Sequence, residues 1–436
     1  MIETGSETEL SPRELRVALS NEWHARPQIG LPAPLRCSHL VCLRGDSNVS
    51  DSRTRFGELC RAQGQSEPGA DSRHHSVQAG NALIKWEGHT EADSYTLLVS
   101  GNGEPPISTP ALQVLDAAHR EDLQANLFVG VHVEVLVGSE ADPENHLPRI
   151  RALLGTNSIY GGHIAEGKAE LWSSFRLDAD GFLRVVILDH GLEEVRLSRY
   201  LQRVLELESY RMLAMLALPM ARDVMGILSK LEPELDAVMR QLATSADEPT
   251  QEVQLQTLTR LAARIEHISD TNSYRFAAAR AYAGIVERRI GELNEHKFGG
   301  APTYGRFLMK SLEPAMNTCD AAEARTHDLA QRVSRATQLL DSMVDMVQKR
   351  QNQAILESMA ERANLQLRLQ QSVEGFSLFA ISYYAVGLFG YLLKSGKCLG
   401  LGVDPDVLTG LSAPLILAVV WLSVRSVKRR LRRASD

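Results

Sequence analysis

Several short motifs that mark common enzyme classes are absent from this sequence. It has no GxxxxGK[ST] phosphate loop, no GxGxxG after an apolar strand, no HExxH zinc motif and no GxSxG nucleophile turn. Each motif places a defined group on its substrate, so its absence argues against that class of enzyme. We predict no catalytic residues, no metal ligands and no cofactor, and other enzyme classes stay open.

Cysteine is also scarce, and no CxxC pair occurs. The five cysteines are odd in number and widely separated, which is typical of unpaired thiols in a reducing compartment. The first fifteen residues are polar and acidic and show no apolar core of a secretory signal. We therefore expect a later segment to direct the protein to a membrane.

Positive charge is sparse in most of the chain. Residues 1–393 hold 39 Lys and Arg against 51 Asp and Glu, a net charge of −12, whereas residues 394–436 hold 8 against 3. An acidic surface repels a phosphate backbone, so we predict no nucleic-acid partner.

Long apolar runs occur near the C-terminus. The run from Val373 to Leu393 has 21 residues with one charge, Glu374, and the run from Val407 to Val424 has 18 residues with none. A helix needs about 20 apolar residues to cross a bilayer. The runs predict a transmembrane hairpin over residues 373–424. The alternatives are two helices buried in a soluble core, or one span with an interfacial helix.

The segment after the hairpin, residues 425–436, is strongly basic, with six Lys and Arg against one Asp. Positively charged segments of membrane proteins stay on the cytoplasmic side. We therefore predict a multi-pass protein of the inner membrane with both termini in the cytoplasm. The residues of this tail expected to contact anionic lipid are Arg425, Lys428, Arg429, Arg430, Arg432 and Arg433.

The N-terminal part alternates apolar and polar residues, as strands do. After a disordered tail at residues 1–10, we predict a cytoplasmic α+β domain over residues 11–190, with about six strands and few helices. Strands are expected at residues 35–43, 82–87, 94–100, 126–137, 170–177 and 182–188. Helices are expected at 11–19, 54–62 and 111–120, with a polar loop at 63–80 and a turn at Gly161-Gly162.

Helical periodicity takes over from Leu192. Residues 191–372 are predicted to form a helical stalk or bundle, and one helix should run from Ala315 into the first apolar run. Apolar positions in this helix step by four and three residues, the spacing of a coiled-coil seam: Leu329, Val333, Ala336, Leu340, Met343 and Val347. The seam predicts packing within the chain or between copies, and we expect a homo-oligomer.

Two polar clusters are candidate ligand-binding sites. The first contains Glu22, His24 and Arg26, whose groups suit a phosphate or carboxylate clamp or one arm of a metal site. Its alternative role is a hydrogen-bonded lock between the first helix and the sheet. The second contains His89 and Glu91, at the expected tip of a hairpin. A divalent-cation site is a further interpretation, if the fold brings both clusters together.

Six segments of the chain are distinctive: residues 21–27 (NEWHARP), 85–91 (KWEGHTE), 175–177 with 180–182 (FRL and DGF), 202–211 (QRVLELESYR), 275–276 with 278–282 (RF and AARAY), and 365–384. They resemble a bacterial family of uncharacterised, predicted membrane-anchored proteins, domain of unknown function 3422. The sequence departs from the family pattern at Ala92 and Asp178. The resemblance implies a membrane-anchored architecture and brings no established activity.

Three functions follow from this layout. We expect first a membrane-anchored scaffold or interaction protein that faces the cytoplasm and forms oligomers. The order of domain, long helix and short membrane hairpin also resembles CorA-type magnesium channels, although Gly390-Tyr391-Leu392 stands where those channels carry Gly-Met-Asn. The third function is a ligand-sensing or enzymatic α+β domain that uses the clusters around His24 and His89.

Overall fold

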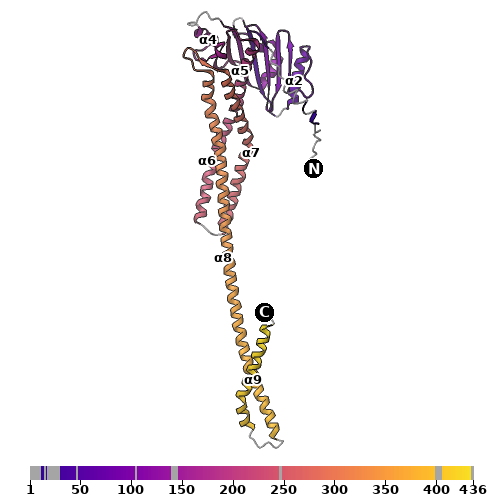
Figure 1. The fold of residues 1–436 in the computed structure, drawn as a ribbon, viewed down its shortest axis with the longest axis vertical. Helices are drawn as coiled ribbons and strands as arrows, with labels where there is room; N and C mark the ends of the chain where they lie inside the picture. The colour runs from indigo at the N-terminus through magenta and orange to yellow at the C-terminus, as the bar shows by residue number, and fades with distance from the viewer. Residues whose placement is uncertain are drawn as a thin grey trace. The chain divides into compact units, whose positions relative to one another are not determined.

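The computed structural model describes residues 11–13, 16, 30–45, 48–103, 106–138, 146–244, 248–397 and 405–433. Contacts divide the chain into two compact units. The first comprises Met1–Ser245 and Glu252–Ala336, and the second comprises Ala246–Gln251 and Thr337–Asp436. A mixed sheet is followed by long helices and a C-terminal helix (Figure 1), as the sequence predicts.

A nine-stranded sheet organises the first unit, in the order β2-β3-β4-β1-β5-β8-β7-β6-β9. Neighbouring strands are antiparallel except for β5 and β8, which are parallel. The strands are β1 (Leu35–Leu43), β2 (His74–Ala79), β3 (Ala82–Gly88), β4 (Ala92–Ser100), β5 (Leu127–Val137), β6 (Tyr160–Ile164), β7 (Ala169–Leu177), β8 (Leu183–Asp189) and β9 (His296–Lys297).

Helices cover both faces of this sheet. Because successive strand residues point to opposite faces, Leu40 and Cys42 of β1 pack toward α2 (Val49–Ala62), while Leu35 and Val41 pack toward α5 (Glu194–Met215). The α2 face also carries η1 (Ala111–Val114) and α3 (Ala117–Ala125), and α4 (His146–Leu154) covers β7 and β8. A short helical turn, η2 (Ala165–Gly167), joins β6 to β7.

Three long helices continue the first unit: α6 (Ala217–Thr244), α7 (Glu248–Leu293) and the first part of α8 (Tyr304–Lys397). They lie side by side (Figure 1). Ion pairs join them, with Arg325 2.6 Å from Glu232 and Arg280 2.5 Å from Glu323. Leu329, Val333 and Ala336 of the predicted seam are buried. This part of the seam therefore packs within the chain.

Two strands stand where the sequence predicts a loop and a turn. Residues 74–79 of the expected loop form β2, an edge strand that pairs along its whole length with β3. Gly161-Gly162 lies inside β6, where a Cβ on Gly161 would stand 1.9 Å from the carbonyl oxygen of Leu171. Both strands have few apolar side chains, so the alternation that signals a strand is weak in them.

Three helix boundaries also differ from the prediction. The helix expected at residues 54–62 begins at Val49, because the side chain of Asn48 caps it. The helix expected at residues 111–120 begins only at Ala117, because the carboxylate of Asp116 accepts the backbone N–H of His119 and caps it. The helix expected from Ala315 begins at Tyr304 and continues through Pro314, between the buried side chains of Leu312 and Ala315.

Apart from residues 248–251 at the start of α7, the described part of the second unit consists of the rest of α8 and of α9 (Pro405–Arg433). The start of α9 packs on the end of α8, since Lys394 Nζ lies 3.2 Å from Asp406 Oδ1 and a Cβ on Gly390 would lie 3.3 Å from Thr409. These contacts make the two helices a hairpin.

Three helical stretches are long and apolar enough to cross a membrane: Glu194–Thr244, Tyr304–Ser395 and Asp406–Ser426. In the first, apolar side chains such as Leu201 and Leu228 are buried in the first unit, which is called the sheet unit below. In the apolar run at the end of the second stretch and in the third stretch they are mostly exposed, and Phe376 and Leu411 reach 75% and 80% exposure. Surface of this kind marks contact with a membrane or another protein. The chain therefore has the character of a membrane-associated protein.

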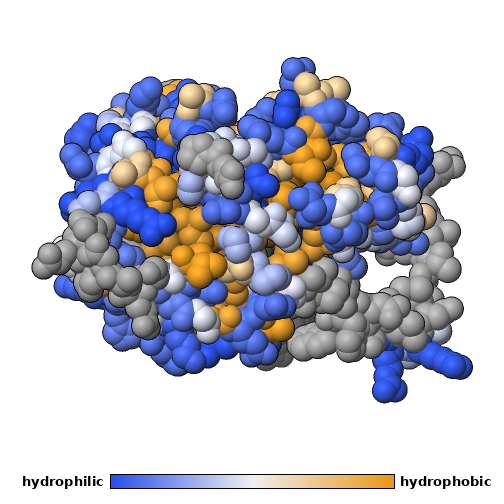
Figure 2. All heavy atoms as spheres, turned by 90° about the horizontal axis from the view of Figure 1, so that it is seen from above, coloured by the Kyte–Doolittle hydropathy of each residue, from blue (hydrophilic) through white to orange (hydrophobic). Residues whose placement is uncertain are grey.

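The face of the molecule that is seen from above has a mixed surface. Apolar side chains gather along the middle of this face and hydrophilic side chains surround them (Figure 2).

Candidate ligand-binding pocket

A cavity of about 450 Å³ lies between the sheet and α5. Residues of β1, β2, β3 and β4 form its floor, and α5 forms the opposite side together with Tyr282 and Ile285 of α7. Pockets for small organic molecules usually measure about 300–1,000 Å³. The cavity is therefore large enough for a small organic ligand.

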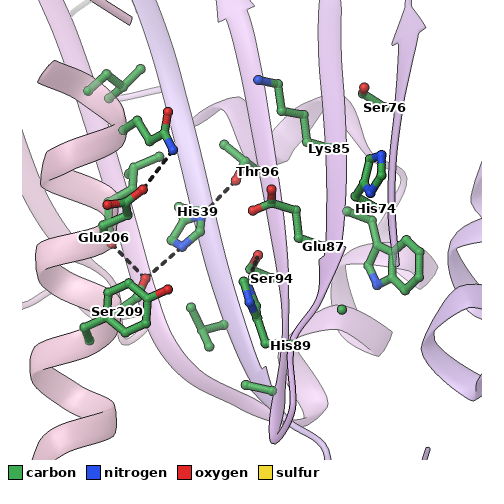
Figure 3. Close-up of a pocket in the computed structure, with 18 of the residues that line it drawn as sticks. His39, His74, Ser76, Lys85, Glu87, His89, Ser94, Thr96, Glu206 and Ser209 are labelled. Atoms are coloured by element: carbon green, nitrogen blue, oxygen red, sulfur yellow. Dashed lines mark hydrogen bonds between the residues drawn. The ribbon is translucent and has the colours of Figure 1, made fainter. Parts of the chain in front are cut away.

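Polar side chains cross the floor of the pocket in two adjacent rows. The first row is His39, Thr96, Lys85 and Ser76, which are direct neighbours on β1, β4, β3 and β2. The second row is Ser94, Glu87 and His74, on β4, β3 and β2. Figure 3 shows these side chains on one face of the sheet, with Glu206 and Ser209 of α5 beside them. The apolar core of a sheet would not contain two adjacent rows of charged and hydrogen-bonding side chains.

His39 is a deeply buried polar group of the floor, at 6% exposure. Its Nε2 lies 3.0 Å from Ser209 Oγ and its Nδ1 lies 2.8 Å from Thr96 Oγ1. Ser209 donates its own hydrogen to the Leu205 carbonyl, so Ser209 accepts from Nε2–H and Thr96 donates to Nδ1. Burial lowers the pKa of His39 to about 3. The imidazole is therefore neutral and fixed in one tautomer.

Lys85 brings a positive charge to the centre of the floor. Its side chain is half-buried, and burial lowers its pKa, partly offset by the nearby charge of Glu87. Within the described part of the chain, its ammonium makes no hydrogen bond and no salt bridge. A cation that loses water without gaining a partner is unfavourable. Lys85 is thus the residue of this pocket that is best placed to bind a ligand.

His89 and Glu91, the second predicted cluster, both line the pocket at the β3–β4 turn. His89 Nε2 lies 3.4 Å from Ser94 Oγ. Glu91 is already engaged, because its carboxylate lies 2.6 Å from Arg275 Nη1 and accepts the Tyr282 hydroxyl at 2.6 Å. Glu91 therefore ties the turn to α7 and has little capacity left for a ligand.

The first predicted cluster, Glu22, His24 and Arg26, lies outside the described residues. A divalent site that joins it to His89 and Glu91 stays a prediction. Within the described ranges, no group of three or more His, Cys, Asp or Glu side chains is arranged to hold a metal ion.

Several pocket residues were not predicted from the sequence as site residues. His74 and His75 were placed in a solvated loop, whereas they belong to β2 and line the pocket. His39 and Lys85 were not proposed as ligands either. One signal was available: Lys85, Glu87 and His89 are spaced by two, which places them on one side of a strand.

A second polar cluster surrounds Glu170, which is 2% exposed. Its carboxylate accepts hydrogen bonds from His146 Nε2 at 2.6 Å, His190 Nε2 at 2.9 Å and Trp172 Nε1 at 2.8 Å. Burial raises the pKa of Glu170, but these hydrogen bonds outweigh it and lower the pKa below its usual value. The cluster joins α4, β7 and the end of β8, and its donors already saturate the carboxylate.

The chain matches a known protein family along most of its length. The match covers residues 11–431, and the family is described as "Protein of unknown function (DUF3422)". The chain belongs to the DUF3422 family. No curated protein matches this member at a significant level.

Three of the distinctive segments of this DUF3422 protein meet around the pocket. Residues 85–91 form part of its floor and residues 202–211 belong to α5 opposite. Residues 275–282 provide Arg275 and Tyr282, which hold Glu91. The other described segments, residues 175–182 and 365–384, lie on the β7–β8 hairpin and in α8.

Proposed function

We propose that this DUF3422 protein is a membrane-anchored binding protein whose sheet unit takes a small polar ligand. The observation that carries the proposal is the ammonium of Lys85, which faces a cavity without a hydrogen-bond or salt-bridge partner among the described residues. A ligand that pairs with this charge would recover the free energy lost on its burial. Of the three functions considered above, ligand sensing has the most support.

The two apolar runs are proposed as the anchor. Val373–Leu393 and Val407–Val424 would cross the inner membrane as a hairpin, and the basic residues that follow would stay in the cytoplasm. The support is the exposure of apolar side chains on both helices and the 4.8 Å contact of Arg425 with the Trp421 ring, at the end where an interface favours indole. Both termini would then face the cytoplasm.

Self-association is a second proposed property, and it would make the protein a scaffold. In α8, the stripe formed by Ile355, Met359, Ala363 and Leu367 is exposed on one side, while Glu361 and Arg368 lie on the other. We infer that a second copy covers this stripe. Two copies anchored by the same run hold their stripes at the same height above the bilayer, so parallel helices would pair in register.

Ligand binding is tested by a thermal-unfolding screen of the detergent-solubilised full chain against a library of small polar metabolites. We expect at least one compound to raise the melting temperature of the natural protein and not that of Ser76→Trp. Ser76 is exposed on β2 and lines the pocket, so the indole would block it. Gln78→Trp is the matched control, since Gln78 is exposed on the same strand face outside the pocket. Equal responses in both variants would contradict the proposal.

A further inference from the structure

The carboxylates that line the pocket are mostly neutralised from outside it. Glu91 pairs with Arg275 at 2.6 Å, and Glu206 pairs with Arg289 and accepts a hydrogen bond from Gln202. Arg275 and Arg289 do not line the cavity. Two of the three lining glutamates therefore contribute little negative charge to a ligand.

The cations of the lining are not neutralised in this way. Lys85 and Arg73 both line the pocket, and neither makes a side-chain hydrogen bond or salt bridge within the described part of the chain. Glu87 is the remaining lining carboxylate, and its charge acts on Lys85. Two cations against this one remaining carboxylate leave a positive surplus, which favours an anion.

The other side of the cavity is apolar. Leu35 of β1, Leu98 of β4 and Leu201 and Leu205 of α5 line it next to the His39 row. His39 itself is already satisfied by Thr96 and Ser209. A ligand that fills the pocket thus meets a charged centre and an aliphatic wall.

We propose that the pocket binds a small organic anion, with a carboxylate or phosphate group at Lys85 and a compact apolar body against the leucines. This inference rests on the proposed ligand-binding function and names the chemical class of the ligand. Lys85 supplies a charge-assisted hydrogen bond, the strongest kind of polar contact in a partly buried site. The leucine wall distinguishes such an anion from inorganic phosphate, which has nothing to place there.

The test measures the binding of five probes to the solubilised full chain by isothermal titration calorimetry, and four of them share an aromatic ring. Benzoate and phenyl phosphate carry an anionic head, benzyl alcohol a neutral one and benzylamine a cationic one, on the same ring. Inorganic phosphate is the probe without an apolar body. We expect benzoate or phenyl phosphate to bind most tightly, and the comparison of the two distinguishes a carboxylate from a phosphate ligand.

Variants at Lys85 connect this preference to the site. Lys85→Met should weaken binding of the preferred anion by about 10- to 100-fold, the effect of losing one hydrogen bond to a charged group. Lys85→Arg should restore part of it. Lys310→Met, at an exposed lysine of α8, is the control and should leave binding unchanged.

Two results would overturn the proposal. One is equal or tighter binding of benzylamine or benzyl alcohol, and the other is unchanged anion binding by Lys85→Met. A third result separates the two proposals. If none of these probes binds, but a metabolite from the thermal-unfolding screen stabilises the natural protein and not Ser76→Trp, the anion proposal fails and the binding function stands. If no compound binds in either experiment, both fail.

Discussion

At the scale of single residues, the pocket separates polar groups that are satisfied from those that are not. His39 has a partner at each ring nitrogen, and Glu91 has one at each carboxylate oxygen. Lys85 has none among the described residues. Buried polar groups are normally paired, so this difference separates residues that hold the fold from the residue that we propose for binding.

The neutral His39 makes stability dependent on pH. Its pKa is about 3 in the folded protein against 6.5 ordinarily, so between these values the unfolded chain binds a proton that the folded chain does not. The free energy of unfolding should therefore decrease as the pH falls below 6.5, by up to about 1.4 kcal/mol for each pH unit from this group. His132, whose pKa is lowered by burial to about 4, acts in the same direction.

We predict that His39→Gln is less stable than the natural protein at pH 7 and that this difference shrinks toward pH 5. Denaturant unfolding at both values measures it. His267→Gln, at an exposed position of α7, is the control and should show no such trend. A difference between His39→Gln and the natural protein that is the same at both pH values would contradict the neutral imidazole.

At the scale of elements, sequence patterns identified the strongly amphipathic segments and missed the others. The strand at Leu35–Leu43 was predicted with its observed bounds, because its apolar residues dominate both faces. The edge strand β2 was missed since HHSVQA is mostly polar and its partner, not its composition, makes it a strand. For the same reason the part of the pocket floor that β2 supplies could not be predicted: β2 brings His74 and Ser76 beside Glu87 and Lys85 only through the sheet order.

The exposed stripe on α8 gives a prediction at the same scale. In native membranes, and in a chain with Cys398→Ser, single cysteines at Met359 and Ala363 should form disulfide-linked dimers on mild oxidation. Cysteines at Glu361 and Arg350, on the opposite side of the helix, should not. The other four cysteines are buried and give no background. Cross-linking that is equal on both sides, or absent on the stripe, would show that no second copy covers it.

At the scale of the whole molecule, the chain joins a unit with a buried apolar core to one whose apolar helices are exposed. The sheet unit buries side chains such as Leu40 and Val131 completely, whereas α9 exposes Leu411 and Leu415 at 80% and 70%. Composition alone could reveal this division, because the apolar runs are continuous. The long-range contacts that build the pocket have no such local signal.

We predict that a protease-sensitive tag at either end of the chain is cleaved in inside-out membrane vesicles and protected in sealed cells. On our proposal the basic residues after Val424 would keep that end in the cytoplasm, and a membrane hairpin would return the preceding domain to the same side. Immunoblotting of each tag after proteolysis measures this. Cleavage of one tag from outside intact cells would show a single span.

The single parallel pair in the sheet has a consequence for the order of folding. Antiparallel strands β2, β3, β4, β1 and β5 form one half of the sheet, and β8, β7, β6 and β9 form the other. Only β5 and β8 join them, with Val131 opposite Leu183 across two intervening strands of sequence. The hairpins β2–β3, β3–β4, β6–β7 and β7–β8 join neighbouring segments and close early, whereas a pairing between distant segments must first meet the entropy of closing a long loop. The pairings β1–β5 (Leu35 with Val135) and β6–β9 (His163 with His296) span more of the chain than Val131 with Leu183 does. The parallel pair is therefore expected to form after the hairpins, and the pairings β1–β5 and β6–β9 are expected to complete the sheet last.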